Sequence, residues 1–285
     1  MLSQLSYAPT CEKGIIPPRR TEAGKYNLAM SPRLAFAIET AVKAGRSTLA
    51  YFQAGAAIQL KEDASPVTIA DQTAERLIRE ELARAYSSEA ILGEEEGQYG
   101  SGETRWVIDP IDGTKSFISG VPLYATLLSF EESGRPILGV CYLPALDELL
   151  YAETNSGTFW NGRLARVSQK SEMKSAVICT GSHRLMDQRG HTENFLTIAR
   201  KTMATRTWSD AYGHALVATG RVEAMVDPSV SRWDISAMKI IVEEAGGVMT
   251  DFSGGDPLRE QAHGSLEAIS SNGKIHSELV EALRG

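Results

Sequence analysis

The stretch VIDPIDGTKSF, Val107 to Phe117, places two aspartates three residues apart, after an apolar run and before a Gly-Thr-Lys turn. The apolar run predicts a short buried strand, so Asp109 and Asp112 are expected at its end. Like charges at this spacing repel each other, and a structural strand end gains nothing from the pair. We therefore expect a cation between the two carboxylates.

Other acids follow the same pattern elsewhere in the chain. A second predicted strand, 90–92, runs into Gly-Glu-Glu-Glu, and a later helix begins within SRWDISAMKIIVEEAGG, residues 231–247. Oxygen ligands from separate elements, with no His or Cys cluster nearby, suit Mg²⁺ or Ca²⁺ better than zinc. We favour Mg²⁺, because a pair of ions about 3.5–4 Å apart stabilises both the attacking and the leaving oxygen in phosphoryl hydrolysis. The candidate ligands are Glu94, Asp109, Asp112 and Asp234.

The turn after Asp112 predicts a phosphate site. Gly113 and Thr114 read as a strand leading into a helix N-terminus, where free N–H groups and the helix dipole attract phosphate. The Thr114 hydroxyl, supported by an acid such as Asp71 or Glu94, could orient and deprotonate a water molecule. Each motif alone has an ordinary explanation as a surface pair, a solvated loop or a helix cap. Their occurrence together favours a phosphate ester as substrate, with no protein nucleophile.

The composition excludes several partner classes. The chain has 285 residues, 42% hydrophobic and 23% charged, with a formal charge of −7, which disfavours nucleic acid and anionic membranes as partners. No apolar run approaches the roughly 18 residues of a membrane helix. Cys11, Cys141 and Cys179 form no CxxC pair, which fits a reducing cytoplasm. We expect a cytoplasmic enzyme that acts on a small phosphorylated metabolite.

The chain divides into an extension and two subdomains. Residues 1–30 are basic, contain a Pro pair and lack the apolar core of a secretory signal, so we expect a poorly ordered extension, with Met30 as a candidate translation start. Residues 31–154 predict helices packed on a sheet, including an antiparallel meander from Leu123 to Glu153. Residues 155–285 alternate strands and helices, as in an α/β layer. The two subdomains are expected to share one cleft.

Two helix starts can be predicted locally. Ser31 followed by Pro32 is typical of an N-cap and the first helical residue. Asp71 stands where the N-cap of a second helix would be, ahead of an apolar stripe through Leu77, Ile78 and Leu82.

Three segments together resemble the inositol monophosphatase family of Mg²⁺-dependent, lithium-sensitive phosphatases. They are GEE at 93–95, WVIDPIDGTKSF at 106–117 and WDISAMKIIVEEAGG at 233–247, and the resemblance covers roughly residues 32–283. It implies a layered αβαβα sandwich, of mixed α+β and α/β character, and a homodimer. It also implies that Glu94, Asp109 and the Ile111 carbonyl hold one Mg²⁺, while Asp109, Asp112 and Asp234 hold a second, with two or three ions in all.

The resemblance implies roles for five further residues. Gly113 and Thr114 would bind the phosphate through their backbone N–H groups, and Thr114 with Asp71 would position the water. Glu95 would support the metal site. Lys61 matches a lysine near the site in relatives, and it is also an ordinary exposed lysine.

The substrate is predicted from stretches outside the metal motifs. Lys115 makes DGTK similar to the histidinol-phosphate and 3′-phosphoadenosine phosphatases. The segment 207–220, TWSDAYGHALVATG, resembles the histidinol-phosphatase branch and offers Ser209 and Asp210 to the leaving group. An acid there could pair with the ammonium or imidazole of histidinol phosphate. Asp227 would place a second carboxylate beside the leaving group.

Other phosphate esters stay open. An inositol pocket also needs acceptors for hydroxyl groups, and Asp210 has a second interpretation as a helix N-cap. GSHRL, residues 181–185, offers Arg184 to an adenosine nucleotide. We predict histidinol phosphate first, inositol monophosphate second and 3′-phosphoadenosine 5′-phosphate third. A non-catalytic binding protein on the same fold is disfavoured, because every ligand and water-positioning residue is present.

Overall fold

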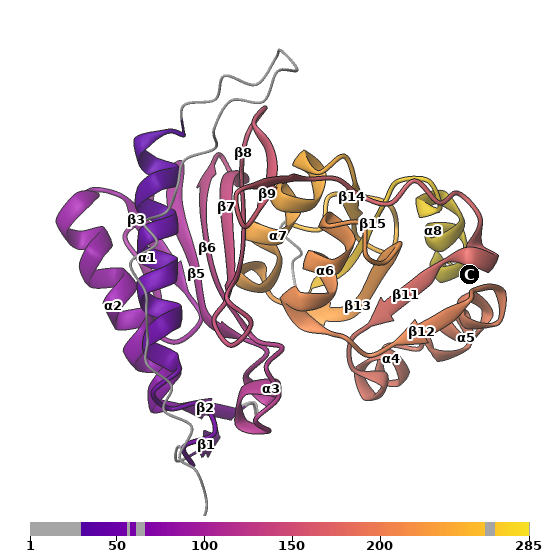
Figure 1. The fold of residues 1–285 in the computed structure, drawn as a ribbon, viewed down its shortest axis with the longest axis horizontal. Coiled ribbons are helices and arrows are strands. Elements are labelled where there is room, and N and C mark those ends of the chain that lie inside the picture. Colours follow the sequence, from indigo (N-terminus) through magenta and orange to yellow (C-terminus); the bar gives the residue numbers. More distant parts are fainter. Residues whose placement is uncertain (1–29, 56–57, 61–65, 260–265, 285) are drawn as a thin grey trace, which may run out of the picture.

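The computed structural model describes residues 30–55, 58–60, 66–259 and 266–284, and their elements form five alternating layers (Figure 1). Two helices cover a large sheet, two more lie between this sheet and a smaller one, and further helices cover the outer face of the smaller sheet. The αβαβα sandwich is therefore confirmed. Two predictions, the poorly ordered extension before Met30 and the role of Lys61, concern residues outside the described ranges.

The first layer consists of α1 (Pro32–Thr48) and α2 (Ile69–Ala85), which pack on one face of the large sheet. As predicted, Ser31 is the N-cap of α1, and its hydroxyl accepts the Leu34 N–H at 3.1 Å. Both helices turn an apolar stripe toward the sheet, where Trp106 is fully buried.

The start of α2 differs from the prediction. Its N-cap is Thr68, the last residue of the short strand β2 (Pro66–Thr68), which pairs with β1 (Ile58–Leu60). Asp71 is the third helical residue, and its Oδ2 accepts the Thr68 N–H at 2.8 Å. The prediction of Asp71 as N-cap is wrong, because the two side chains form a reciprocal capping box in which the hydroxyl comes first.

The large sheet has eight strands in the order β10-β9-β8-β7-β6-β5-β3-β4. They are β3 (Ala90–Gly93), β4 (Gly97–Tyr99), β5 (Thr104–Asp112), β6 (Ala125–Glu132), β7 (Arg135–Leu143), β8 (Glu148–Glu153), β9 (Gly157–Trp160) and β10 (Arg163–Ala165). The predicted antiparallel meander is confirmed as β6, β7 and β8. Strands β9 and β10 follow the expected subdomain boundary and still pair in this sheet.

The pairing of β3 with β5 determines where the acids meet. These two strands are parallel, with Gly93 opposite Ile108. Because parallel strands end at the same edge of a sheet, the Glu94 loop and the end of β5 lie side by side. The helix α3 (Thr114–Ile118) follows β5 after one residue.

The second half builds the remaining layers. Helices α6 (Asp210–Ala218) and α7 (Arg232–Glu244) lie between the sheets and bury one contiguous core with both. The small sheet, in the order β12-β11-β13-β15-β14, is mixed, since β13 is parallel to β11 and antiparallel to β15. Its strands are β11 (Val177–Thr180), β12 (Ala204–Arg206), β13 (Ala224–Val230), β14 (Val248–Thr250) and β15 (Leu266–Ser271).

The outer face of the small sheet is covered by α4 (His183–Gln188), α5 (Thr192–Lys201) and α8 (His276–Arg284), with the 3₁₀ turn η1 (Met173–Ser175) before β11. None of the helices in the described ranges combines the length and the apolar character that crossing a bilayer requires.

Candidate active site

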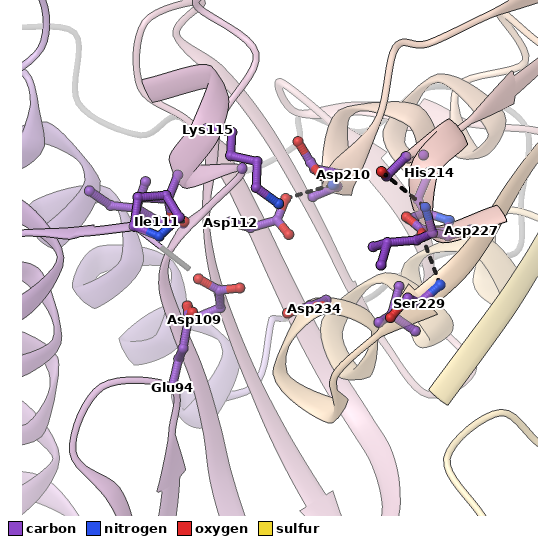
Figure 2. A pocket seen from close by; sticks show the side chains of 18 residues that line it. Glu94, Asp109, Ile111, Asp112, Lys115, Asp210, His214, Asp227, Ser229 and Asp234 are labelled. Carbon is purple, nitrogen blue, oxygen red and sulfur yellow. Dashed lines mark hydrogen bonds between the residues drawn. The ribbon is translucent and has the colours of Figure 1, made fainter. Parts of the chain in front are cut away.

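A polar cavity of about 190 Å³ lies where the end of β5 faces β13 and the N-termini of α6 and α7 (Figure 2). Most of the predicted site residues line it, although they come from both halves of the chain. These lining residues are Glu94, Asp109, Ile111, Asp112, Gly113, Thr114, Asp210, Asp227 and Asp234.

Three of the acids have the geometry of a metal site. Asp109, Asp112 and Asp234 each offer a carboxylate oxygen, and these oxygens lie within 4.8 Å of one another. Oδ1 of Asp109 is buried and has no hydrogen-bond partner among the described residues. A buried carboxylate oxygen without a donor is costly unless a cation binds it. The oxygen-only donor set suits a hard divalent cation such as Mg²⁺, so these residues fit the predicted metal.

The electrostatics of the cluster lead to the same conclusion. Burial, reinforced by the negative charges of neighbouring acids, raises the pKa of Asp109 and of Asp112 well above the usual range. Burial raises the pKa of Asp234 to about 7, and the charges of Glu94 and Asp210 act in the same direction. Because the ionised cluster repels itself, it gains stability either from protons or from a bound cation.

Two of the acids are oriented by backbone N–H groups. Oδ2 of Asp112 accepts the Ala211 N–H at 2.6 Å, so a residue at the end of β5 binds the first turn of α6. Oδ2 of Asp234 accepts the Ser231 N–H at 2.7 Å within the capping box of α7. In each carboxylate one oxygen is held by the fold, which leaves the other for the cavity.

The phosphate turn has the predicted form. Gly113 has a φ of 81°, in the left-handed region that favours glycine, and it is the N-cap of α3. A Cβ at this position would also lie 3.0 Å from Oδ2 of Asp210. The N–H groups of Gly113 and Thr114 precede the first helical hydrogen bond of α3, so they are suited to bind an anion.

Thr114 connects this turn to Asp71. Its hydroxyl lies 3.1 Å from the Ile111 carbonyl oxygen and makes a longer contact of 3.5 Å with Oδ1 of Asp71. Thr68 donates its hydroxyl to Oδ2 of Asp71 at 2.6 Å, so Oδ1 is the oxygen that faces Thr114. Burial raises the pKa of Asp71, which increases its proton affinity. The pair can therefore move a proton away from a molecule bound at Thr114.

A second group of acids lines the other side of the cavity, where Figure 2 shows Asp210, His214, Asp227 and Ser229. Burial, together with the charge of Asp210, raises the pKa of Asp227 to about 8. Burial also raises the pKa of Asp210, while the charge of nearby Lys115 opposes this rise. This side of the cavity is therefore suited to a cationic group.

His214 is a lining residue whose role the sequence did not predict. It is buried, its Nδ1 lies 2.7 Å from the Ser270 hydroxyl, and burial lowers its pKa to about 4. A neutral imidazole in the cavity can serve as a hydrogen-bond partner without adding charge. His214 follows Asp210 by four residues, and this helical spacing on one face could have indicated that His214 lines the same cavity.

The alternative interpretation of Asp210 as a helix N-cap is wrong. The N-cap of α6 is Ser209, whose hydroxyl donates to Oδ2 of Asp210 at 3.3 Å. Asp210 is the first helical residue, with a φ of 59°. The Ser209 side chain makes no capping hydrogen bond, and the Ala211 N–H, at the second helical position, donates to Asp112 instead.

Several predicted residues lie away from the cavity lining within the described part of the chain. Arg184 is exposed on α4, and Ser209 reaches the site only through Asp210. Glu95 lies one residue beyond Glu94, and its backbone N–H donates to Oε2 of Glu75 at 2.8 Å. Glu75 itself was missed, although a glutamate aligned with Asp71, Ile78 and Leu82 on the buried stripe of α2 was a visible sign.

Comparisons with known proteins agree with this geometry. The model of the inositol monophosphatase family matches residues 29–285. A histidinol-phosphatase from Chlorobaculum parvum is 42% identical over 258 residues, which cover 89% of this chain and 97% of the relative. A fructose-1,6-bisphosphatase/inositol-1-monophosphatase from Thermotoga maritima is 41% identical over 219 residues, covering 76% and 82%. The solved structure of a Thermotoga maritima IMPase superimposes with a TM-score of 0.80 at 36% identity, covering 89% of this chain and 97% of that one.

Proposed function

Because this chain belongs to the inositol monophosphatase family and is a phosphoric monoester hydrolase, we propose that it uses Mg²⁺ to hydrolyse histidinol phosphate to histidinol and phosphate. One observation carries the choice of substrate. The half-buried Asp210 and the buried Asp227 line the cavity beside the cluster of metal-ligand carboxylates and are not themselves part of it. The histidinol-phosphatase from Chlorobaculum parvum supports the same choice.

The residues that would hold the metal are all in the cavity lining. Glu94, Asp109 and the Ile111 carbonyl would bind one ion, and Asp109, Asp112 and Asp234 would bind another. When bound, Mg²⁺ neutralises charge on the phosphoryl oxygens and lowers the pKa of a coordinated water.

The chain itself would position the phosphate and the water. The backbone N–H groups of Gly113 and Thr114 bind a phosphoryl oxygen at the start of α3. The Thr114 hydroxyl accepts a hydrogen bond from the water and donates its own proton toward Oδ1 of Asp71, 3.5 Å away. Asp71 is held in place by Thr68, so its free oxygen stays directed at Thr114. The geometry thus needs no covalent intermediate.

The leaving group would lie against the second group of acids. Histidinol carries an ammonium and an imidazole, and the carboxylates of Asp210 and Asp227 can pair with either cation. His214 and Ser229 add neutral polar groups to the same wall. The cation of the substrate would also relieve the repulsion between Asp210 and Asp227, which adds to the effect of burial in raising the pKa of Asp227.

We further propose that the enzyme acts in the cytoplasm as a homodimer on a small metabolite. The net charge of −7 supports a metabolite over nucleic acid. Light scattering after size-exclusion chromatography tests the assembly, since each chain contributes 30.9 kDa.

Phosphate release by the purified protein with Mg²⁺ tests the substrate. Histidinol phosphate, inositol 1-phosphate, fructose 1,6-bisphosphate and 3′-phosphoadenosine 5′-phosphate are compared at equal concentration. We expect the highest kcat/KM for histidinol phosphate. Asp210→Asn should lower that value about 10- to 100-fold, because a hydrogen bond to a charged group contributes roughly 1.5–3 kcal/mol.

The activity of Asp210→Asn on inositol 1-phosphate is the control. This substrate carries no cationic group, so the substitution should change its kcat/KM much less. A preference for inositol 1-phosphate that Asp210→Asn leaves intact would contradict histidinol phosphate as substrate. It would favour the second candidate, inositol monophosphate, because the same acids can accept hydrogen bonds from its hydroxyl groups.

A further inference from the structure

We propose that Glu75 is a positioning residue for the metal site, which fixes the loop that carries Glu94. This inference rests on the proposed Mg²⁺-dependent function. Glu75 lies on α2 one turn after Asp71, and its side chain is completely buried. It does not line the cavity, so any effect on the metal must act through the loop.

The Glu75 carboxylate binds the loop directly after Glu94, at residues 95 and 96. Its Oε2 accepts the Glu95 N–H at 2.8 Å, and its Oε1 accepts the Glu96 N–H at 3.0 Å. The preceding N–H, that of Glu94, donates to the Ile108 carbonyl at 3.2 Å. Three consecutive N–H groups are therefore bound, one by the neighbouring strand and two by a single carboxylate. The backbone of Glu94 is held on both sides.

Arg79 completes this arrangement. Its Nε donates to Oε1 of Glu75 at 2.8 Å, and its Nη2 donates to the Gly97 carbonyl at 2.5 Å. The guanidinium thus neutralises the buried carboxylate and closes the far end of the same loop. Together, Glu75 and Arg79 bind the loop at residues 95, 96 and 97.

Gly93 provides the space for this contact. A Cβ at position 93 would overlap Oε1 of Glu75 and would lie 2.7 Å from Nη2 of Arg79. The glycine before Glu94 is therefore required by the approach of Glu75. It offers a second way to disturb the same contact.

The charge of Glu75 is needed as well as its shape. Three N–H groups point at its two oxygens, so both oxygens must be acceptors. A glutamine would place an NH₂ group against one of these donors and leave a buried donor unpaired. We expect this mismatch to release one of the loop N–H groups and displace Glu94.

Mg²⁺ binding measured by isothermal titration calorimetry, without substrate, tests the inference. Glu75→Gln should weaken Mg²⁺ binding about 10- to 100-fold, the usual effect of removing a group that orients a metal ligand. Higher Mg²⁺ concentrations should restore kcat in the phosphatase assay. In the metal-free protein, hydrogen exchange at residues 95 and 96 should become faster in this variant than in wild type.

Glu223→Gln is the matched control. Glu223 is also a buried carboxylate, but its partners are the backbone N–H of Val177, at 2.7 Å, and the Lys170 ammonium, at 3.3 Å, instead of the loop at residues 94–97. This variant should lower thermal stability and leave Mg²⁺ affinity unchanged. The comparison separates loss of stability from loss of positioning.

Gly93→Ala keeps the inference testable if Glu75→Gln does not fold. It should weaken Mg²⁺ binding in the same way, and the double variant should bind Mg²⁺ no more weakly than the worse single variant, because both changes break one contact. A folded Glu75→Gln or Gly93→Ala protein with wild-type Mg²⁺ affinity would overturn the role of Glu75. A wild-type protein that binds no Mg²⁺ would instead overturn the proposed metal together with this inference.

Discussion

Asp227→Asn is expected to stabilise the metal-free protein while it damages the proposed activity. Asp227 is 6% exposed, and burial raises its pKa to about 8 from an ordinary 3.8. Asparagine keeps the oxygen that accepts the Ser229 N–H at 3.4 Å and removes only the charge. The substitution therefore isolates the electrostatic cost of a buried acid.

The size of the effect follows from proton linkage. Above pH 8 the folded protein holds an ionised Asp227 that burial disfavours, and at about 1.36 kcal/mol per pKa unit the difference between 3.8 and about 8 corresponds to about 6 kcal/mol. At pH 5 the folded group is protonated while the unfolded group is mostly ionised, so Asp227 lowers the free energy of unfolding by only about 2 kcal/mol. The advantage of Asp227→Asn should therefore shrink as the pH falls from 9 to 5.

Thermal unfolding in EDTA measures this difference. For a chain of this size, roughly 2 °C per kcal/mol predicts an increase in Tm of about 10 °C at pH 9 and a few degrees at pH 5. Glu172→Gln, at a side chain that is 61% exposed, should leave Tm unchanged at both pH values. An equal Tm for Asp227→Asn and wild type at pH 9 would refute the reasoning that burial destabilises this carboxylate.

Three further changes probe the site. Asp112→Asn should abolish most phosphatase activity with the fold intact, because it removes a metal-ligand charge while Ala211 can still donate to the remaining oxygen; retained activity would contradict the metal assignment. Thr114→Ala should lower kcat about 100-fold or more while Thr114→Ser retains most of it, which steady-state kinetics at saturating Mg²⁺ would show. In EDTA, wild-type stability should fall as the pH rises from about 4 to 7, since the folded Asp234, with a pKa of about 7, binds a proton that the unfolded group has released. Mg²⁺ at 100 times its Kd should then raise the free energy of unfolding by about 2.7 kcal/mol, as measured in denaturant titrations. A free energy of unfolding that depends on neither pH nor Mg²⁺ would contradict the assignment of this cluster as a metal site.

Local sequence was sufficient for the features that depend on neighbouring residues. The N-cap at Ser31, the meander after Leu123 and the strand–turn–helix around Gly113 were all predicted, because hydrophobic period and turn chemistry act over a few positions. The cap of α2 was misassigned by three residues, since Thr68 and Asp71 both have capping side chains and only the backbone geometry distinguishes their roles.

By itself, then, the sequence indicated the candidate metal ligands, because acids follow predicted strands and begin a predicted helix. It indicated the layered fold through the resemblance of the motifs around Glu94, Asp109 and Asp234 to those of the family. Only the tertiary structure decided which other side chains reach them. Asp112 binds the first turn of α6, Asp210 enters the cavity while Arg184 does not, and Glu75 holds the Glu94 loop. These contacts join residues far apart in the chain, and no local period or spacing encodes the distance between them.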